Sequence, residues 1–420
     1  MKIVFICGGA GKRMHPLTED KFMLKFLGKT LLKHQINMAI EAGLSCFVIV
    51  ANSQNIERIK KIVTGIPGIR VETAVQREPL GIANALESAR NYLDDEIVLV
   101  NPNDIFDAAA YLKLQTVKDS DSTTSYLFGY KVDSYFRGGY ISIDKKGYLK
   151  DIIEKPAKGK EPSNIVNVLI HLHRDPQRLL EYIAKVTTDR DDAYECAISA
   201  MVADGHNIKT LPLRGKWNAI KYPWHILDVT ERFLSTMKGS ISPSARISKR
   251  AILEGQVVVD YNAVIMENAV IRGPVYIGPH TVVGTGSIVR DNSHIGAHCN
   301  IGFSTEVKGS YIGDNNHFHM NYIGDSIIGN GCNFGAGTIL ANYRFDQGTV
   351  KVKIGEHLID TGRIKFGAII GNNCKTGINT SIMPGIKISP GSIVGPHICI
   401  SEDVVMDIIG TAKQTRIKRK

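Results

Sequence analysis

The second half of the chain repeats an aliphatic residue at every sixth position. The series runs through Ile247, Leu253, Val259, Ile265, Ile271, Ile277, Val283, Val289, Ile295, Ile301 and Val307. A fixed hexapeptide period is the signature of a parallel β-helix, in which each sixth side chain points inward and three hexads close one triangular coil. The same step resumes at Ile364, Ile370, Thr376, Ile382, Ile388, Val394 and Ile400. Irregularity inside a regular repeat is typical of a functional site, so we expect a functional site between Val307 and Ile364.

The first half, from Lys2 to about Tyr222, alternates short β-branched runs with helical segments. The expected strands are Ile3–Cys7, Phe47–Ala51, Ile97–Asn101 and Ile165–Leu172, and the expected helices are Leu31–Gly43, Gly81–Leu93 and Pro176–Thr187. Such alternation predicts βαβ units and a largely parallel sheet. Pro223–Lys238 is predicted to be a connecting helix that caps one end of the β-helix.

These patterns predict an α/β domain at residues 1–222, a connecting helix at 223–239, a β-helix at 240–405 and a basic tail at 406–420. No apolar run approaches the ~20 residues of a membrane span. The 7 scattered cysteines contain no Cys-x-x-Cys pair, so they indicate neither a disulfide framework nor a cysteine zinc site. The formal charge is +10, and no aromatic residues are interleaved with the basic residues of the tail. This pattern favours anionic metabolites as partners over a nucleic acid or a membrane. We therefore expect a cytoplasmic protein.

The first predicted strand runs into a glycine-rich turn with basic residues, within Cys7–Thr18. Because glycines let backbone N–H groups approach phosphate oxygens, this turn is a candidate phosphate cradle, with a plain structural turn as the alternative. It is neither a Walker A loop nor a dinucleotide fingerprint, since Met14 stands where the third glycine of the fingerprint belongs.

The same turn resembles the signature of the sugar-1-phosphate nucleotidylyltransferases, a glycine-rich turn and Arg followed by Pro-Leu-Thr and a Lys before an apolar segment. Further family-like pieces follow in order, namely Gln76, Gly81 and Ala83, then Asn103-Asp104, Gly139, Glu154-Lys155-Pro156 and Asn167. The resemblance implies an α/β Rossmann-like nucleotidyltransferase domain. In this reaction a sugar phosphate oxygen attacks the α-phosphorus of a nucleoside triphosphate and pyrophosphate leaves.

The resemblance also assigns roles to residues of this half. Arg13 and Lys21 would be catalytic residues that hold phosphates, and Asp104, expected at the surface, would hold Mg²⁺. The nucleotide-binding residues would be Gly8, Gly9, Gly11, Gln76 and Gly81. The sugar-phosphate contacts would be Gly139, Glu154, Lys155 and Asn167. His171 and His173, which stand where the family tends to have an aromatic, are expected at the sugar pocket.

Two motifs mark the irregular stretch of the β-helix, a His-x-x-Tyr-x-Gly-Asp run from His319 and a Gly-Ala-Gly-Thr run from Gly335. They resemble the acetyltransferase half of the bifunctional N-acetylglucosamine-1-phosphate uridyltransferases. The resemblance implies a left-handed β-helix, acetyl-CoA as co-substrate and a homotrimer whose sites lie between subunits. N-acetylation needs a base to take a proton from an attacking amine, and a neutral imidazole suits that task.

We therefore expect His319 to be the general base of an amino-sugar-phosphate acetyltransferase. The sugar phosphate would contact Arg290, Lys308, Tyr322 and Asn333, and acetyl-CoA would contact Ala336, Asn342 and Tyr343. Arg290 and Lys308 are separated by one full turn of the solenoid, eighteen residues. We expect them on adjacent coils, where both can meet one phosphate.

Two departures from the family pattern leave alternatives open. Asp20-Lys21-Phe22 lacks both prolines of the usual Pro-Lys-Pro, and Ala219 occupies the place of the second metal carboxylate. An alanine cannot ligate Mg²⁺. One alternative is therefore an acetyltransferase with a degenerate nucleotidyl domain, and another is a non-catalytic regulatory or scaffold subunit.

Overall fold

The computed structural model describes residues 1–9, 11–120 and 123–405. The chain divides into two compact units, of which the first comprises Met1–Ala10 and Leu31–Ala219 and the second comprises Gly11–Thr30 and Ile220–Lys420. The basic tail predicted at 406–420 lies outside the described residues. Within the described part of the chain, no helix has the length and apolar character needed to cross a bilayer.

A nine-stranded sheet forms the centre of the first unit, in the order β10-β9-β11-β6-β1-β4-β5, with β8 paired to β11 and β12 to β8. Its strands are β1 (Lys2–Ile6), β4 (Cys46–Ala51), β5 (Arg70–Val75), β6 (Ile97–Val100), β8 (Ser125–Lys131), β9 (Gly139–Ile143), β10 (Leu149–Glu154), β11 (Ile165–His173) and β12 (Ile208–Pro212). Strands β5, β4, β1 and β6 are parallel, as the βαβ pattern predicts. Strands β8 to β11 add antiparallel pairs, because no helix separates β8, β9, β10 and β11.

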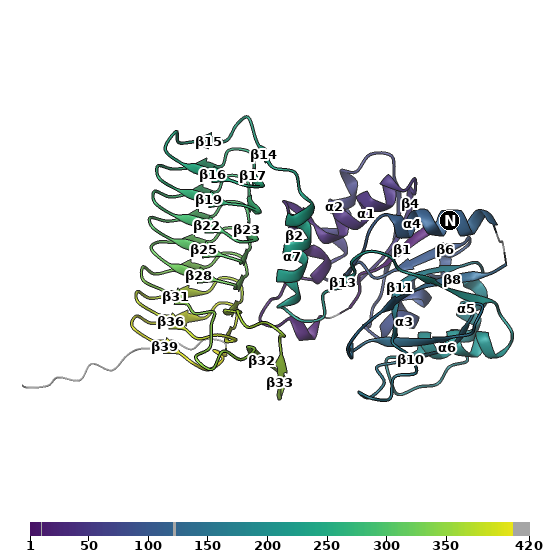
Figure 1. Cartoon of the computed structure of the whole chain (residues 1–420). Coiled ribbons are helices and arrows are strands. Elements are labelled where there is room, and N and C mark those ends of the chain that lie inside the picture. The colour runs from purple at the N-terminus through teal and green to yellow at the C-terminus, as the bar shows by residue number, and fades with distance from the viewer. Residues whose placement is uncertain (10, 121–122, 406–420) are drawn as a thin grey trace, which may run out of the picture. The chain divides into compact units, whose positions relative to one another are not determined.

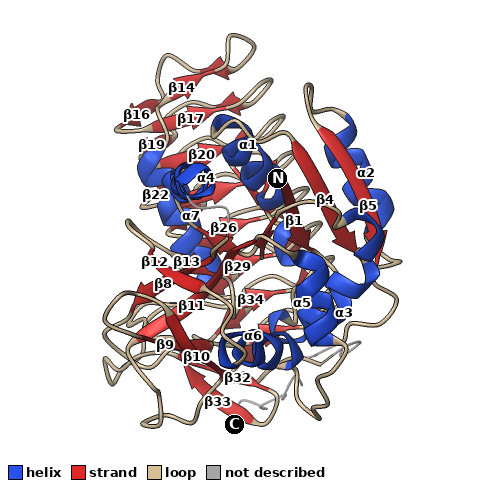
Figure 2. Ribbon diagram, turned by 90° about the vertical axis from the view of Figure 1, so that its right-hand side faces the viewer, coloured by secondary structure: helices blue, strands red, loops and turns tan. Residues whose placement is uncertain are grey.

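Six α-helices belong to the described part of this unit (Figure 2). They are α1 (Leu31–Glu41), α2 (Ile56–Thr64), α3 (Gly81–Ser88), α4 (Ala109–Ser120), α5 (Pro176–Ile183) and α6 (Ala193–Ala203). Helix α5 starts where the sequence predicts, since Pro176 suits the first turn and the Asp175 side chain accepts a hydrogen bond from the Arg178 amide. Helices α3, α5 and α6 share one apolar core with the sheet.

The second unit contains a parallel β-helix whose coils stack strand upon strand in three sheets (Figure 1). The first sheet comprises β14 (Ser240–Ile241), β17 (Val257–Val259), β20 (Val275–Ile277), β23 (Ser293–Ile295), β26 (Tyr311–Ile312), β29 (Ile327–Ile328), β34 (Ile369–Ile370) and β37 (Lys387–Ile388). The second comprises β15 (Arg246–Ile247), β18 (Val264–Ile265), β21 (Val282–Val283), β24 (Asn300–Ile301), β27 (His317–Phe318), β30 (Asn333–Phe334), β35 (Lys375–Thr376) and β38 (Ile393–Val394). The third comprises β16 (Ile252–Glu254), β19 (Val270–Arg272), β22 (Ile288–Arg290), β25 (Glu306–Lys308), β28 (Tyr322–Gly324), β31 (Ile339–Leu340), β36 (Ser381–Ile382) and β39 (Cys399–Ile400).

The hexapeptide prediction is confirmed in the core of these coils. The sixth-position residues from Ile265 to Val307 are all buried and form one continuous apolar cluster. The series then passes through Ile312, Phe318, Ile323, Ile328, Phe334 and Leu340, with some intervals one residue shorter. Ile364, which the sequence places in the resumed series, is exposed, and the series resumes at Ile370. The reason is an inserted hairpin, β32 (Lys351–Ile354) with β33 (His357–Asp360), between β31 and β34.

Helix α7 (His225–Thr236) packs on the side of the first β-helix sheet rather than on its end, so the predicted end cap is wrong. The cause is apolar burial, because Leu234 and Met237 pack against Tyr276 of β20. The segment Gly11–Thr30 packs on the same side. The ring of Phe26 lies 5.7 Å from that of Tyr311, and Lys25 forms a 2.6 Å ion pair with Asp314. This packing places the segment in the second unit.

Candidate active sites

The predicted nucleotide loop assembles at the carboxyl ends of β1 and β5. Gln76 follows β5, and its side-chain Nε2 donates hydrogen bonds to the Gly81 carbonyl and to Asn84 Oδ1, each at 3.0 Å. A Cβ atom on Gly8 would overlap the Gln76 side chain, so the glycine is required for this approach. The structure therefore brings Gly8, Gln76 and Gly81 together. Gly9 is exposed beside them, with nothing within 4 Å of the Cβ position.

The two predicted catalytic cations, Arg13 and Lys21, belong to the second unit through the segment Gly11–Thr30. The Arg13 guanidinium lies 5.8 Å from the centre of the Tyr222 ring. Lys21 Nζ donates a 3.1 Å hydrogen bond to the Ile220 carbonyl. Gly11 has a φ of 59°, which makes a glycine suitable at the start of this turn. The cations are thus tied to the chain that immediately precedes α7.

The predicted metal ligand Asp104 begins the short strand β7 (Asp104–Ile105), which pairs with β13 (Asn218–Ala219). In this antiparallel pair Ala219 lies directly opposite Asp104. Asp104 is only 5% exposed, which corrects the expectation of a surface group, and Trp217 Nε1 donates a 3.1 Å hydrogen bond to its Oδ1. A longer side chain at position 219 would therefore lie beside the Asp104 carboxylate.

The surroundings of Asp104 fit a divalent cation that prefers oxygen ligands. Asn103 Oδ1 is buried without a hydrogen-bond donor. The same holds for Oε1 of Gln35, whose Nε2 donates a 2.7 Å bond to the Asp104 carbonyl. Across residues 1–9, 11–120 and 123–405, no cluster of three or more His, Cys, Asp or Glu side chains suits a metal. A Mg²⁺ held here would take its remaining ligands from phosphates and water.

Restoring a carboxylate at position 219 is expected to strengthen this site. Side chains directly opposed in an antiparallel pair have Cβ atoms about 5 Å apart, so Ala219→Asp would place a second carboxylate beside Asp104. We expect the Mg²⁺ concentration for half-maximal pyrophosphate release to fall by about tenfold. The matched control is Ala219→Asn, which adds similar volume without charge. An Asp variant with an unchanged Mg²⁺ requirement would show that the missing ligand does not limit this unit.

The predicted sugar-phosphate residues converge on three neighbouring strands, β9, β10 and β11. Glu154 pairs with Gly139, and a Cβ atom on Gly139 would lie 2.9 Å from Glu154 Oε2 and 3.4 Å from Asn167 Cβ. Lys155 forms a 2.7 Å ion pair with Glu154 and has a left-handed φ of 49°. Gly139 is itself buried, and its lack of a Cβ lets the Glu154 and Asn167 side chains approach the strand this closely.

A buried carboxyl behind this site is expected to make stability depend on pH. Burial, followed by the charge of Glu154, raises the pKa of Glu195 from 4.5 to about 8. Between these values the folded state keeps a proton that the unfolded chain has lost, so stability falls as pH rises from 4.5 to 8. Glu195→Gln should match the parent protein at pH 4.5 and melt several degrees higher at pH 8. The exposed Glu181→Gln is the control, and equal melting temperatures at pH 8 would contradict the prediction.

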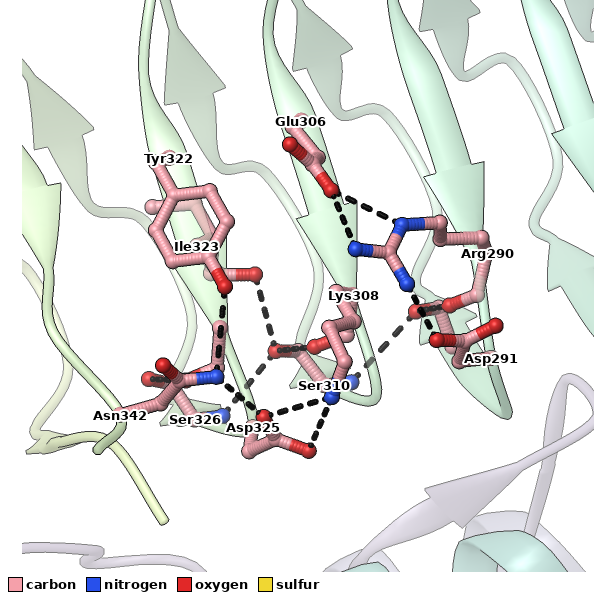
Figure 3. Close-up of polar contacts among 12 residues, drawn as sticks. Arg290, Asp291, Glu306, Lys308, Ser310, Tyr322, Ile323, Asp325, Ser326 and Asn342 are labelled. Atoms are coloured by element: carbon pink, nitrogen blue, oxygen red, sulfur yellow. Dashed lines mark hydrogen bonds and ion pairs between the residues drawn. The ribbon is translucent and has the colours of Figure 1, made fainter. Parts of the chain in front are cut away.

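A second polar site lies on the third β-helix sheet and extends from the last regular coils into the interrupted part of the repeat. Arg290 of β22 stands directly beside Lys308 of β25, as their spacing predicts. Figure 3 shows that carboxylates already engage both cations. Arg290 Nε donates a 2.8 Å hydrogen bond to Glu306, and Lys308 Nζ lies 2.8 Å from Asp325 Oδ2. An incoming phosphate would therefore share these cations with fixed carboxylates.

Tyr322 and Asn342 extend the same cluster. Asn342 Nδ2 donates to the Tyr322 hydroxyl at 3.2 Å and also to Asp325 (Figure 3). A Cβ atom on Gly324 would lie 2.6 Å from that nitrogen, so the Gly of the motif is needed for the approach. Burial, and then the charge of Glu306, raise the pKa of Tyr322. Its hydroxyl therefore keeps a proton to donate to a ligand.

His319 and Ala336 occupy two turns that Asn321 joins. The amide of His319 donates a 2.8 Å hydrogen bond to Asn321 Oδ1, and Asn321 Nδ2 donates to the carbonyls of Gly335 and Thr338. The His319 side chain is exposed, and among the described residues its imidazole makes no hydrogen bond. The backbone of His319 is thus held in place while its imidazole ring stays accessible.

Asn333 and Tyr343 stand apart from the cluster of Figure 3. Asn333 lies on the second sheet, level with His317 and Lys375, and its side chain is exposed. Tyr343 follows Asn342, forms a bridge with Lys365 and is half exposed. The structure thus brings together Arg290, Lys308, Tyr322 and Asn342, and leaves the other predicted contacts on neighbouring surfaces.

The sequence-based prediction of site residues missed the acidic members of this cluster, Glu306, Asp325 and Asp291. Asp325 is 8% exposed and contacts both Lys308 and Asn342. Its signal was present, because it is the last residue of the His-x-x-Tyr-x-Gly-Asp run. Glu306 carries no motif and could be found only from the register that sets β25 beside β22.

Comparisons with known proteins find relatives that match the chain along its whole length. The model of the family described as Nucleotidyl transferase matches residues 2–231. "Bifunctional protein GlmU" of Methanococcus maripaludis strain C7 is 38% identical over 96% of this chain and 95% of that protein. The protein of the same name from Methanocaldococcus jannaschii is 32% identical over 100% of both chains. "Bifunctional sugar-1-phosphate nucleotidylyltransferase/acetyltransferase" of Sulfurisphaera tokodaii is 30% identical over 96% of this chain and 98% of that protein.

The fold and the nucleotide loop define a nucleotidyl transferase unit joined to a left-handed hexapeptide β-helix with a polar site of its own. This combination is typical of one class of protein, the transferases that carry two sites on one chain. The chain belongs to the nucleotidyl transferase family and, along its whole length, to the bifunctional GlmU proteins within it.

Proposed function

We propose that this protein makes a nucleotide-activated sugar with its first unit and acetylates an amino-sugar phosphate with its second. The observation that carries the proposal is the end-to-end match to bifunctional relatives, which spans both candidate sites. These relatives lend no support to an acetyltransferase with a degenerate first unit or to a scaffold subunit.

The nucleotidyl reaction joins a sugar 1-phosphate oxygen to the α-phosphorus of a nucleoside triphosphate and releases pyrophosphate. It needs positioning and positive charge rather than a covalent nucleophile. In our proposal Gln76 and the Gly8 turn hold the nucleotide, and Arg13 and Lys21 hold its phosphates. Asp104 holds Mg²⁺, which would offset the charge on the phosphates.

The sugar-phosphate substrate of this reaction is assigned to the strands around Gly139. Glu154 and Asn167 meet over Gly139 and offer an acceptor and an amide to sugar hydroxyl groups. Lys155, held by Glu154, supplies a positive charge close to this pair. A carboxylate and an amide beside a glycine suit a hydroxyl-rich ligand because each can exchange its hydrogen bonds with water for bonds to the sugar.

The acetyl reaction transfers an acyl group from the thioester of acetyl-CoA to the amine of an amino-sugar phosphate. The exposed His319 imidazole takes the proton that the amine loses as its nitrogen attacks the carbonyl. Arg290 and Lys308 bind the phosphate, and Tyr322 and Asn333 orient the sugar. The Ala336 turn, Asn342 and Tyr343 receive the coenzyme, and a backbone N–H of that turn can donate to the oxyanion.

Two wider properties stay predictions of this proposal. A homotrimer would bring neighbouring β-helices together at the acetyl sites, and cyclic closure is a common solution for such subunits. Light scattering at micromolar concentration should give a mass three times that of one chain, and the mass of a single chain would contradict the trimer. The second is a location in the cytoplasm.

The deciding experiment tests both reactions on one preparation. Protein, Mg²⁺ and each nucleoside triphosphate are incubated with glucosamine-, N-acetylglucosamine-, glucose- or mannose-1-phosphate, and pyrophosphate is measured. Thiol release from acetyl-CoA is measured in parallel with the amino-sugar phosphate. We expect both products. Thiol release without pyrophosphate from any pair would favour the acetyltransferase-only alternative, and neither product would favour the scaffold.

A further inference from the structure

Behind Asn167, strand β11 and helix α6 form a buried chain of hydrogen bonds. His171 Nε2 lies 2.8 Å from Asn167 Oδ1, His171 Nδ1 lies 2.6 Å from the Tyr194 hydroxyl, and His173 Nε2 lies 2.8 Å from the same hydroxyl. His171, His173 and Tyr194 are each 3% exposed or less. The two histidines therefore lie behind the sugar pocket rather than in its lining.

The chemistry of each member fixes the direction of these bonds. An amide oxygen only accepts, so His171 Nε2 carries the proton and donates to Asn167. Burial and the neighbouring His173 hold the pKa of His171 well below 6.5, so its ring is neutral and Nδ1 accepts. The Tyr194 O–H therefore donates to His171. Its oxygen is left to accept from His173 Nε2, a ring that burial keeps neutral by lowering its pKa to about 4.

The hydrogen bond to His171 also sets which side of the Asn167 amide faces the pocket. With Oδ1 held by His171, the Nδ2 group lies toward Gly139, 3.8 Å from the position where a Cβ would stand. Glu154 Oε2 lies 2.9 Å from that same position. A carboxylate that only accepts suits an amide nitrogen on that side rather than an amide oxygen. An unrestrained amide could turn over and present its oxygen instead.

We propose that His171, Tyr194 and His173 are positioning residues of the nucleotidyl reaction, which hold Asn167 with its N–H groups toward the sugar 1-phosphate. The inference rests on the sugar-binding role proposed for Asn167. The chain acts only through Asn167, so its loss weakens sugar-phosphate binding and leaves triphosphate binding and the chemical step in place.

The test is a set of variants of the full-length protein, assayed for pyrophosphate release. His171→Phe keeps a buried planar ring but cannot donate to Asn167. We expect the KM for the sugar 1-phosphate to rise by about tenfold, which corresponds to the loss of one buried hydrogen bond. The KM for the triphosphate and kcat should stay within about twofold. His171→Gln, whose amide can donate to Asn167, should recover most of the loss.

Two controls separate this inference from the proposed function. A retained kcat and an unchanged KM for the triphosphate report that the first unit of the variant is folded, and if His171→Phe loses them, the smaller change Tyr194→Phe decides. Asn167→Ala should raise the same KM at least as much as His171→Phe. An unchanged KM in Asn167→Ala would overturn the role of Asn167 and the inference with it. A raised KM in Asn167→Ala with an unchanged KM in both His171→Phe and Tyr194→Phe would overturn the positioning chain alone.

Discussion

Replacing His319 with alanine is expected to lower the rate of acetyl transfer to an amino-sugar phosphate by ~10²–10⁴-fold, the usual contribution of a general base. The imidazole is exposed, and its position depends on the hydrogen bond from its backbone amide to Asn321 Oδ1, which alanine also makes. The fold and the turn at Ala336 should therefore survive. Thiol release from acetyl-CoA measures the rate, and pyrophosphate release by the same sample serves as the control.

A matched variant distinguishes the base from a binding residue. Arg290→Ala removes a proposed phosphate contact, so it should raise the KM for the amino-sugar phosphate more than it lowers kcat. It also frees Glu306 and Asp291 from their cation, which adds repulsion toward a phosphate. If His319→Ala mainly raised KM and Arg290→Ala mainly lowered kcat, His319 would be the binding residue and Arg290 the residue needed for the chemical step. Absence of thiol release with every amino-sugar phosphate, from about pH 6 to 9, would make both β-helix motifs structural.

The repeat of the second half could be predicted because one physical requirement acts at every sixth residue. Each coil must place an aliphatic side chain in a core that water does not enter, and residues such as Ile277 and Val289 are fully buried. The core residues of the coils from Ile312 to Leu340 were harder to predict. Where a turn is one residue shorter, the next side chain still reaches the core but the sequence period shifts. The hairpin β32–β33 then interrupts the period altogether, which is why Ile364 was misplaced.

Site residues were predictable where spacing along the chain becomes adjacency in space. Arg290 and Lys308 lie side by side because one coil separates them. The acidic partners of these cations could not be predicted, since Asp325 and Glu306 are recognised only once the register sets them beside Lys308 and Arg290.

Contacts between distant segments could not be predicted either. The hydrogen-bonded chain of His171, Tyr194 and His173 joins β11 to α6, and no local sequence pattern links these elements. The packing of Gly11–Thr30 on the β-helix likewise depends on contacts such as Lys25 with Asp314, far apart in the sequence.

Replacing Asp104 with asparagine is expected to abolish metal-dependent pyrophosphate release, with a loss of at least ~10²-fold. The change removes one negative charge from the only carboxylate of the β7–β13 pair, because Ala219 provides none opposite it. Asparagine suits the test better than alanine. The carboxylate is buried and accepts from Trp217 Nε1, and alanine would leave that donor without an acceptor.

Direct binding measurements make the result independent of turnover. Titration with Mn²⁺, followed by electron paramagnetic resonance in the presence of the triphosphate, should show a bound metal in the parent protein and a much weaker one in Asp104→Asn. Trp217→Phe is the matched control, since it removes the indole donor but keeps the carboxylate, and it should retain the metal. Thiol release by the β-helix should be equal in all three proteins. Equal metal affinity in Asp104→Asn would place the cation elsewhere, and the buried oxygens of Asn103 and Gln35 would then need another explanation.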